Sequence, residues 1–381
     1  MRIGLNATCF NDRPSGARQR FTGIYGALVA RRPDIEFVVY EPADCNVARW
    51  FCGAANVVAQ QTPIPSTGRL RRIWRGRDYW PTALRADSLD LFEVFSLPLV
   101  QAPDCPTILT IHDLRSVTTD QPLPARIITA RVMQSAFRRA DQIVTVSRTM
   151  NAQIRSICPR ARVTTIYNGV DLAKFGPASS ETALPVRSAQ PFLLAVGHLE
   201  ARKNYGVLIE AISRLMARGV PVPLIIVGNE GGEGPRIAAR ISELGVGEFV
   251  TVRREVGDTE LLALYRAARM IAFPSHYEGF GIPILEAMAS HRPIVLSDIP
   301  VFHEIAGDAG AYFPAGDADA MADVIGRVWK SESERESLVR QGDGRLPSFV
   351  FDALAAQLEA LYETVSGGRA RRDNVRQPPE A

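Results

Sequence analysis

The chain has 381 residues, of which 46% are hydrophobic and 22% are charged, and its formal net charge is +3. This length is too great for one ordinary hydrophobic core and predicts two domains, and the composition is normal for a globular protein. No apolar run approaches the roughly 20 residues that span a bilayer, and the first ten residues lack the layout of a signal peptide, so we expect a cytoplasmic protein.

The charge is distributed unevenly along the chain. Residues 1–180 hold 23 Lys and Arg against 14 Asp and Glu, whereas residues 181–381 hold 21 against 27. A basic first half predicts an anionic partner, which leaves nucleic acid, an acidic membrane and a phosphorylated substrate open. The five cysteines are odd in number and lack CxxC spacing. We therefore expect reduced thiols rather than a disulfide framework or a zinc site.

Short apolar strands alternate with helical patterns in the first half, which predicts an α/β fold with a parallel sheet. The strands are predicted at 2–6, 35–40, 107–112, 142–146 and 163–166, and the helices around 19–31 and 125–139. The first strand leads into "NDRPSGARQR", where Gly16 precedes a helix and could admit a phosphate, although an ordinary turn explains the same pattern. Residues 167–191 lose the periodicity and fill with Gly, Pro, Ser and Ala, as a linker does.

The second half repeats the same alternation. Its strands are predicted at 192–196, 223–228, 249–252, 270–275 and 293–297, and its helices at 204–218, 233–244, 258–268, 283–290, 317–329 and 349–365. Two doubly wound sheets of this kind would bury their strands on both faces and leave a cleft between the domains. Ligands bind beyond the carboxyl ends of such strands, which directs attention to the segments that follow them.

The segment "AVGHLEARKN" follows one of these strands. Arg202 and Lys203 lie just before a helix that Asn204 could cap. Two cations at a helix N-terminus oppose its dipole unless an anion shares the site, and a diphosphate suits both side chains. A solvated basic pair on a loop is the alternative.

The segment "PSHYEGFGIPILEAMASHRPIV", residues 274–295, places Glu278 before a glycine-rich turn and Glu286 in the helix that follows. Pro283 suits the first helical turn, and Gly279 and Gly281 let backbone approach a ligand closely. Carboxylates accept hydrogen bonds from vicinal hydroxyl groups. Two acids on either side of an anion site therefore predict a nucleotide sugar, with Glu278 at the sugar and Glu286 at the ribose. A surface charge and a residue that complements the helix dipole are the alternatives.

These segments resemble the retaining glycosyltransferases of family 4, which have the GT-B fold of two Rossmann-like domains. The resemblance rests on "GHLEARKN", "PLIIVGN", the E-x7-E element from Glu278 to Glu286, and "VTTIYNGVD" near the end of the first domain. "TIHDLRS" and "IVTVSR" extend it to the mannosyltransferase branch of bacterial polysaccharide assembly. The resemblance implies domains at 1–173 and 191–348 with a linker at 174–190. It also implies that helix 349–366 packs back on the first domain. The tail at 367–381 is polar, and we expect it to be disordered.

The resemblance also implies roles for particular residues. His112 and Glu278 are expected to contact the transferred sugar, and Asp113 to face the acceptor. The residues expected at the donor are Gly16, Ser147, Arg202, Lys203, Phe280, Gly281, Ile282 and Glu286. Such enzymes use the nucleotide sugar as a substrate, so no cofactor and no metal are expected. "AGDADA" contains a DxD pattern, but Asp317 opens a helix there, and we interpret it as an N-cap.

Two positions depart from the family pattern. His198 stands where many relatives have Arg, and His291 stands where a glycine is usual. We expect local changes at both positions, while the E-x7-E element is retained.

The sequence leaves the donor and the acceptor open. GDP-mannose is the first choice, and UDP- or dTDP-sugars are alternatives, as is a non-catalytic nucleotide-sugar-binding protein. The acceptor is expected to be a glycan or a polyprenyl-diphosphate-linked oligosaccharide. The segment "GRLRRIWRGRDYW", residues 68–80, combines five arginines with three aromatic residues. It suits peripheral contact with an anionic membrane as well as it suits a solvated basic face. No nucleic-acid-binding module is recognised.

Overall fold

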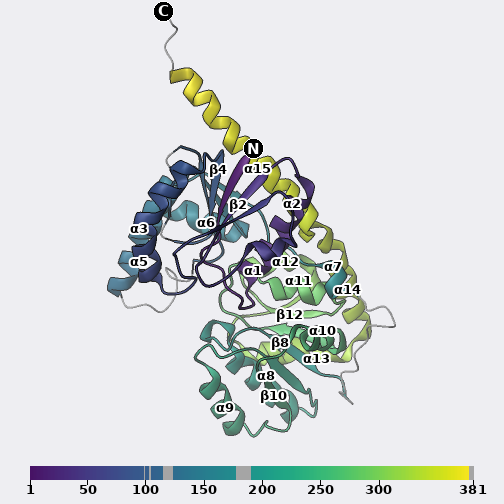
Figure 1. The fold of residues 1–381 in the computed structure, drawn as a ribbon. Coiled ribbons are helices and arrows are strands. Elements are labelled where there is room, and N and C mark those ends of the chain that lie inside the picture. The colour runs from purple at the N-terminus through teal and green to yellow at the C-terminus, as the bar shows by residue number, and fades with distance from the viewer. Residues whose placement is uncertain (98, 103, 115–122, 177–189, 377–381) are drawn as a thin grey trace, which may run out of the picture. The chain divides into compact units, whose positions relative to one another are not determined.

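The computed structural model describes residues 1–97, 99–102, 104–114, 123–176 and 190–376, and it divides the chain into two units. The first unit comprises Met1–Gly169 together with Phe351–Ala381, and the second comprises Val170–Val350. Each unit is built on a parallel sheet flanked by helices (Figure 1), so the predicted α/β class with two doubly wound domains is confirmed. Most of the predicted linker, at 177–189, lies outside the described residues.

The first unit contains a seven-stranded sheet in the order β3-β2-β1-β4-β5-β6-β7, with every neighbouring pair parallel. Its inner strands are buried on both faces, as a parallel sheet covered by helices requires. Strands β3 and β4 were not predicted. The strands are β1 Arg2–Asn6, β2 Glu36–Glu41, β3 Val57–Gln61, β4 Leu91–Val94, β5 Thr107–Ile111, β6 Gln142–Thr145 and β7 Val163–Thr165.

The predicted helix 19–31 is longer and less regular in the structure. It is a continuous helical stretch from Gly16 to Arg31, interrupted by a π-helical turn, and Ser15 caps its start by accepting a hydrogen bond from Arg18 N. The helical elements of this unit are α1 Gly16–Arg20, η1 Phe21–Tyr25, α2 Gly26–Arg31, η2 Ala48–Phe51, α3 Arg69–Ala86, α5 Leu123–Arg139, α6 Arg148–Ile157 and α15 Phe351–Arg376.

Helix α3 continues through Gly76 and Pro81, two residues that are unfavourable inside a helix. Proline inside a helix removes one backbone hydrogen bond. Here packing compensates, because Trp80 and Leu84 are buried and the Trp80 ring lies 5.7 Å from that of Phe92 in the sheet. Tertiary burial therefore overrides the local propensity.

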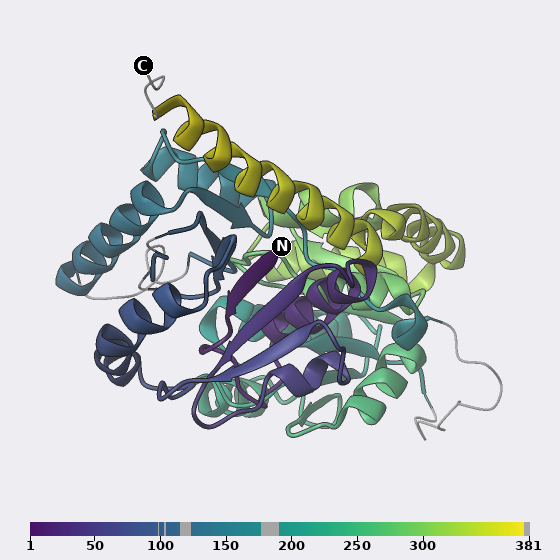
Figure 2. The ribbon, with the colours of Figure 1, turned by 45° about the horizontal axis from the view of Figure 1, so that its top comes forward.

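Helix α15 joins the core of the first unit although it lies at the far end of the chain (Figure 2). Leu354, Leu358 and Tyr362 are fully buried, at the spacing of one helical face. Helix α15 continues to Arg376, so residues 367–376 of the predicted disordered tail are helical. Glycine lowers helix propensity by about 1 kcal/mol, which is too little to stop a helix already formed by its docked segment.

The second unit contains a six-stranded parallel sheet in the order β10-β9-β8-β11-β12-β13. Strand β13 was not predicted, and the others lie where the sequence placed them. The strands are β8 Leu193–Val196, β9 Leu224–Val227, β10 Val250–Arg253, β11 Met270–Phe273, β12 Ile294–Ser297 and β13 Gly310–Phe313.

Helices flank this second sheet, and most of them were predicted. The helices α7, α12 and α14 and the short turns η3, η4 and η5 were not. The helical elements are α7 Leu172–Phe175, η3 Ala201–Lys203, α8 Tyr205–Ala217, α9 Gly234–Glu243, α10 Asp258–Ala267, α11 Ile282–Ala289, α12 Pro300–Ala306, η4 Gly307–Ala309, α13 Ala318–Lys330, α14 Glu332–Arg345 and η5 Leu346–Phe349.

Both sheets have one point at which the strand order reverses. In the first unit this point lies between β1 and β4, and in the second between β8 and β11. The loops that leave the carboxyl ends of these strand pairs diverge, and the resulting crevice is where open α/β sheets bind ligands. The fold thus directs attention to residues just after β1, β4, β8 and β11.

Candidate active site

The switch point of the second sheet brings together the two segments that the sequence analysis singled out. The chain leaving β8 forms the turn η3, which contains Arg202 and Lys203, and the chain leaving β11 reaches Glu278. The two loops are joined by a hydrogen bond in which His276 N donates to the Arg202 carbonyl oxygen at 2.8 Å.

Glu278 lies at the centre of this cluster and binds both cations. One carboxylate oxygen, Oε2, lies 2.7 Å from Arg202 Nη1, and the other, Oε1, lies 2.6 Å from Lys203 Nζ. Ser275 Oγ donates to Glu278 Oε1 at 3.0 Å, and Glu200 pairs with Arg202 at 2.6 Å. The side chains of Glu278 and Lys203 are each 10% exposed, so these pairs are largely shielded from water.

The surroundings shift the pKa values of these groups. Burial raises the pKa of the Glu278 carboxyl, but the charges of Lys203 and Arg202 outweigh burial, and the pKa lies below its usual value. Burial lowers the pKa of Arg202, but Glu278 and Glu200 outweigh it, and the net shift is upward. Glu278 and Arg202 therefore both carry their full charge at neutral pH.

Glycine conformations shape the backbone around the cluster. Gly281 adopts φ of 102° and serves as the N-cap of α11, in a left-handed conformation that disfavours other residues. Gly228 packs so closely that a Cβ atom there would lie 1.9 Å from the Gly197 carbonyl oxygen. These glycines let two loops and a helix N-terminus meet at the carboxyl edge of the sheet, next to Glu278.

Glu286 lies on α11 and is 8% exposed. Its Oε2 accepts a hydrogen bond of 2.8 Å from the Tyr265 hydroxyl. Burial, together with the charge of Glu286, raises the pKa of Tyr265 well above its usual value, so the tyrosine stays a donor. Glu286 lies within α11 as predicted, and because α11 begins at Ile282 it falls in the second helical turn.

The remaining predicted donor contacts of this unit lie next to Gly281. Phe280 is buried, and its ring lies 6.1 Å from that of Phe349. Ile282 is the first residue of α11 and is also buried. The structure thus brings the predicted residues from Glu278 to Glu286 into one turn and one helix.

The prediction that Asn204 caps the next helix is wrong. Asn204 precedes α8 but adopts a left-handed conformation with φ of 54°, and its side chain makes no capping hydrogen bond. Its Nδ2 atom is buried without a partner among the described residues. A strained residue with an unmet donor beside Arg202 and Lys203 is a feature of ligand sites rather than of stable helix starts.

In the first unit, His112 follows β5 directly. Its Nε2 atom is buried and has no hydrogen-bond partner within the described part of the chain. Burial, with a smaller contribution from the charge of Arg20, lowers the pKa of His112 to about 3, so the imidazole is neutral at physiological pH. Asp113 is the next residue and is partly exposed.

The two other predicted residues of the first unit lie at helix starts. Gly16 is the first residue of α1, behind the cap Ser15. Ser147 is fully buried and caps α6, where its Oγ accepts from Met150 N at 3.1 Å. The Ser147 hydroxyl therefore has a structural role in addition to any contact with a ligand.

The departure at His291 has a structural explanation. His291 follows α11 in the left-handed conformation, with φ of 52°. Its N–H donates to Met288 O, and Arg292 N donates to Ala287 O, which together form a Schellman motif. Glycine is favoured at this position, and His291 compensates in part through its Nδ1, 3.2 Å from Asp343. His198, the other departure, is exposed.

The interpretation of Asp317 as a helix cap is confirmed, since its Oδ1 accepts from Asp319 N and Ala320 N at 3.0 Å each. No group of His, Cys, Asp and Glu suited to a metal ion occurs within the described ranges. No disulfide joins the five cysteines, all of which lie in described segments. No helix in the described part of the chain is both long and apolar enough to cross a membrane.

Sequence reasoning missed three members of the site: Ser275, Tyr265 and Glu200. Ser275 lies three residues before Glu278, a spacing that could have suggested the hydrogen bond. Tyr265 comes from α10 and nothing in its local sequence indicates the contact with Glu286. Glu200 lies two residues before Arg202, where its ion pair was overlooked.

Comparisons with known proteins agree with this architecture. Residues 180–345 match the family described as Glycosyl transferases group 1, and residues 14–174 match Glycosyltransferase Family 4. The chain is 30% identical over 269 residues to O-antigen chain mannosyltransferase B of Escherichia coli. The aligned region covers 67% of this chain and 70% of that protein. It is 27% identical to the phosphatidyl-myo-inositol mannosyltransferase of Mycolicibacterium smegmatis, over 98% of this chain and 99% of that one.

Among solved structures, sucrose-phosphate synthase of Thermosynechococcus elongatus is similar, with a TM-score of 0.80 and 20% identity over 96% of this chain and 99% of that chain. Two parallel-sheet units of this kind define a glycosyltransferase of the GT-B class. The chain belongs to glycosyltransferase family 4.

Proposed function

We propose that this glycosyltransferase transfers mannose from GDP-mannose, with retention of configuration, to a glycan or a lipid-diphosphate-linked oligosaccharide in the assembly of a bacterial surface or exported polysaccharide. The choice of mannose is supported by the relatives, which include mannosyltransferases of an O-antigen chain and of phosphatidyl-myo-inositol. The observation that carries the donor site is the pairing of Arg202 and Lys203 with Glu278 at the switch point of the second sheet.

In this proposal the diphosphate of the donor takes the place of Glu278 as the partner of Arg202 and Lys203. The two cations are held by Glu278 in the free protein, at 2.7 and 2.6 Å. A diphosphate carries more negative charge than one carboxylate and binds Arg in two places at once. It would therefore displace Glu278 from both cations. The released carboxylate, still held by Ser275, would then accept hydrogen bonds from the hydroxyl groups of the transferred sugar.

The same residues would assist bond cleavage. As the bond from the sugar to the diphosphate breaks, negative charge grows on the leaving group and the sugar becomes oxocarbenium-like. Arg202, Lys203 and the N-terminus of α11 at Gly281 would stabilise the growing charge. Because these groups supply positive charge themselves, we expect transfer to persist in excess EDTA. Retention of configuration follows from the family resemblance.

The remaining roles stay predictions of the resemblance. Glu286, oriented by Tyr265, is assigned to the ribose. His112 is assigned to the transferred sugar, where a neutral imidazole can donate or accept one hydrogen bond. Asp113 is assigned to the acceptor, and Gly16 and Ser147 to the donor.

We further propose that α3 contacts an anionic membrane. Leu70 and Trp74 of this helix are 81% and 68% exposed, and Arg71 and Arg75 lie beside them. Exposed apolar side chains flanked by arginine are typical of helices that bind membrane surfaces. Sedimentation with vesicles of anionic lipid and with vesicles of neutral lipid should distinguish a membrane-binding helix from a solvated basic face. Wild type should sediment with anionic vesicles, and Arg71→Glu/Arg75→Glu should not; equal sedimentation of both proteins would refute the contact.

The donor assignment is tested by hydrolysis of GDP-mannose, UDP-glucose, UDP-N-acetylglucosamine and dTDP-rhamnose by the purified protein. We expect GDP-mannose to be cleaved fastest and Glu278→Ala to be inactive. Faster cleavage of a UDP- or dTDP-sugar would show that this sugar, and not mannose, is the one transferred. Binding of a donor with no turnover, even with acceptor extracts, would favour a non-catalytic binding protein.

A further inference from the structure

A ligand-sized space lies in the first unit, and residues of α3 form part of its wall. It is a cavity of about 490 Å³, within the range of small-molecule sites. It opens at the switch point of the first sheet, where Asn6 ends β1 and Thr8 follows it, and where Ser96 and Leu97 follow β4. Helix α3 covers its other side. The fold therefore places this cavity where open α/β sheets bind their ligands.

The charged groups around the cavity are all positive. Its described lining contains four arginines and no acid, and three of the arginines come from α3. Arg72 donates to Ser96 Oγ at 2.7 Å, and its Nε is buried with no partner in the described segments. Arg139 donates to Gln101 at 2.8 Å. None of the four is paired with a carboxylate of the described residues.

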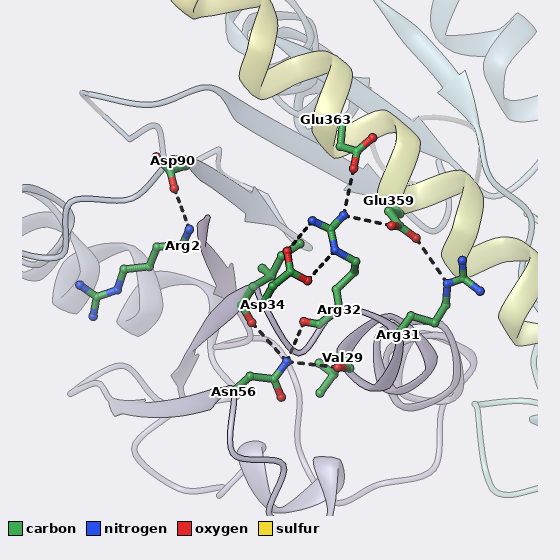
Figure 3. Close-up of polar contacts among 10 residues, drawn as sticks. Arg2, Val29, Arg31, Arg32, Asp34, Asn56, Asp90, Glu359 and Glu363 are labelled. Carbon is green, nitrogen blue, oxygen red and sulfur yellow. Dashed lines mark hydrogen bonds and ion pairs between the residues drawn. The ribbon is translucent and has the colours of Figure 1, made fainter.

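Other arginines of the same unit are neutralised. Figure 3 shows Arg32 bound by Asp34 and by Glu359 and Glu363 of α15, and Arg31 bound by Glu359. Acids are thus available in this unit and are placed on other arginines. The uncompensated positive charge at the cavity calls for an anion from outside the chain.

The rest of the lining is apolar. Ile64, Trp80, Leu97 and Leu99 are among the side chains that form it, and each of Ile64, Trp80 and Leu99 is at least nine-tenths buried. Ile73 lines the cavity and is also 42% exposed, next to the exposed Trp74 on the same helix. Ile73 therefore offers apolar surface both to the cavity and to the solvent beside Trp74, and we call these two side chains the apolar path.

We propose that this cavity binds a phosphate or diphosphate ester of an apolar chain, with the arginines at the phosphate and the chain along the apolar path. Arginine binds phosphate oxygens in a bidentate manner, and the apolar wall favours an alkyl or prenyl chain over a sugar. Resting on the function proposed above, the site would hold the acceptor, which is then a lipid phosphate and not a free glycan.

The test uses the full-length protein and soluble probes in isothermal titration calorimetry. Farnesyl diphosphate represents a prenyl diphosphate, and dihexanoylphosphatidic acid represents a phospholipid. Farnesol carries only the apolar chain, and inorganic diphosphate carries only the anionic group. We expect one of the two esters to bind at least about tenfold more tightly than farnesol or inorganic diphosphate. The ester that binds more tightly identifies the source of the phosphate.

Two pairs of variants locate the binding. Arg72→Gln/Arg77→Gln should weaken the ester by at least about tenfold, because a charged hydrogen bond is lost at each position. Arg131→Gln/Arg138→Gln removes the same charge from exposed positions of α5 outside the cavity lining and should leave the affinity within about twofold. Arg77→Gln/Arg85→Gln, which disturbs no hydrogen bond within the described residues, serves if the first variant unfolds.

Three results would overturn the proposal: equal affinity in wild type and the cavity variants, equal binding of inorganic diphosphate, or loss of binding in Arg202→Gln/Lys203→Gln. The last result would place the ester at the donor site. Hydrolysis of the donor without acceptor is measured in parallel and should persist in Arg72→Gln/Arg77→Gln. A protein that binds the ester but cleaves no donor would refute the proposed function and leave the cavity assignment standing.

Discussion

Replacing Glu278 with glutamine separates donor binding from catalysis. In the free protein the carboxylate lies 2.7 Å from Arg202 and 2.6 Å from Lys203 and must leave both before a diphosphate can bind them. Two unit charges about 4 Å apart interact by about 4 kcal/mol at an effective dielectric constant near 20, and by about 1 kcal/mol in water. Partial burial places this site between those limits.

We therefore expect Glu278→Gln to bind GDP more tightly, by about 1.4 to 2.7 kcal/mol, which is roughly tenfold to a hundredfold. Turnover should move in the opposite direction. The variant loses a group that binds the sugar hydroxyls most strongly in the transition state, and we expect cleavage of the donor to fall at least about a hundredfold. A residue with a purely structural role would weaken both binding and turnover.

Calorimetric titration with GDP and a donor-hydrolysis assay measure the two effects. Glu210→Gln is a matched control, because Glu210 pairs with Arg240 at 2.7 Å in the same unit, outside the site. It should change neither quantity by more than about twofold. If Glu278→Gln binds GDP no more tightly than wild type, the carboxylate does not compete with the diphosphate and the exchange of partners is refuted.

The same variant has a predictable dependence of stability on pH. Because the pKa of Glu278 is lowered on folding, its contribution is fully present above the unfolded value of about 4.3 and is lost as pH falls through the folded value. Without ligand, Glu278→Gln should be less stable than wild type by about 3 kcal/mol at pH 7, since two shielded cations lose their partner. This difference should shrink below pH 4.3, and a denaturant series at pH 7 and pH 3.5 measures it; a constant difference would show that the ionised carboxylate is not its source.

Three further predictions concern single residues. The His112 ring protons should show no NMR titration between pH 5 and 8, because the pKa is lowered to about 3; a midpoint near 6.5 would contradict the burial argument. Tyr265→Phe should weaken GDP binding by about 1 to 3 kcal/mol in calorimetry, since Glu286 loses a buried donor, and unchanged affinity would remove Glu286 from the ribose. His291→Gly should raise the free energy of unfolding by up to about 1 kcal/mol in a denaturant series, because it relieves the left-handed strain; a loss of stability would show that the Asp343 contact outweighs the strain.

Most of the strands that were predicted are short runs dominated by apolar residues. Strand β4, "LFEV", escaped because Glu93 breaks its apolar run. In the structure Glu93 is fully buried and accepts hydrogen bonds from Tyr25 at 2.6 Å, from Thr110 at 2.5 Å, and from Tyr362. Burial raises the pKa of Glu93. The donors come from a helix, a strand and the distant α15, so no local pattern could reveal that an acid is tolerated there.

Strand β3 escaped for the opposite reason. It is an edge strand with the sequence "VVAQQ", and most of its side chains are partly or fully exposed. An exposed edge does not need the apolar run that marks an inner strand, and it carries polar residues that prevent further pairing. Its existence follows from pairing with β2 and not from its own composition.

At the site, the sequence located the residues but not their mutual contacts. Glu278, Arg202 and Lys203 were placed at one sheet edge because each follows a strand in the same unit. The acid and the cations were predicted to bind different parts of a ligand, whereas in the free protein they bind one another. A pattern reports which groups a ligand needs, and it does not report how those groups satisfy each other when the ligand is absent.

The two switch points differ in whether acids of the chain neutralise the cations there. At the second, the cations are matched by Glu278 and Glu200, so the site is stable when empty and a ligand must outcompete an internal anion. At the first, the cavity arginines are unmatched by described acids, and a ligand there adds charge compensation without displacing anything. An internal competitor suits a ligand that must leave after each turnover, because it favours release of the diphosphate product. At the first switch point no described carboxylate competes with the ligand. This suits a ligand that the site must capture from a dilute or membrane-bound pool.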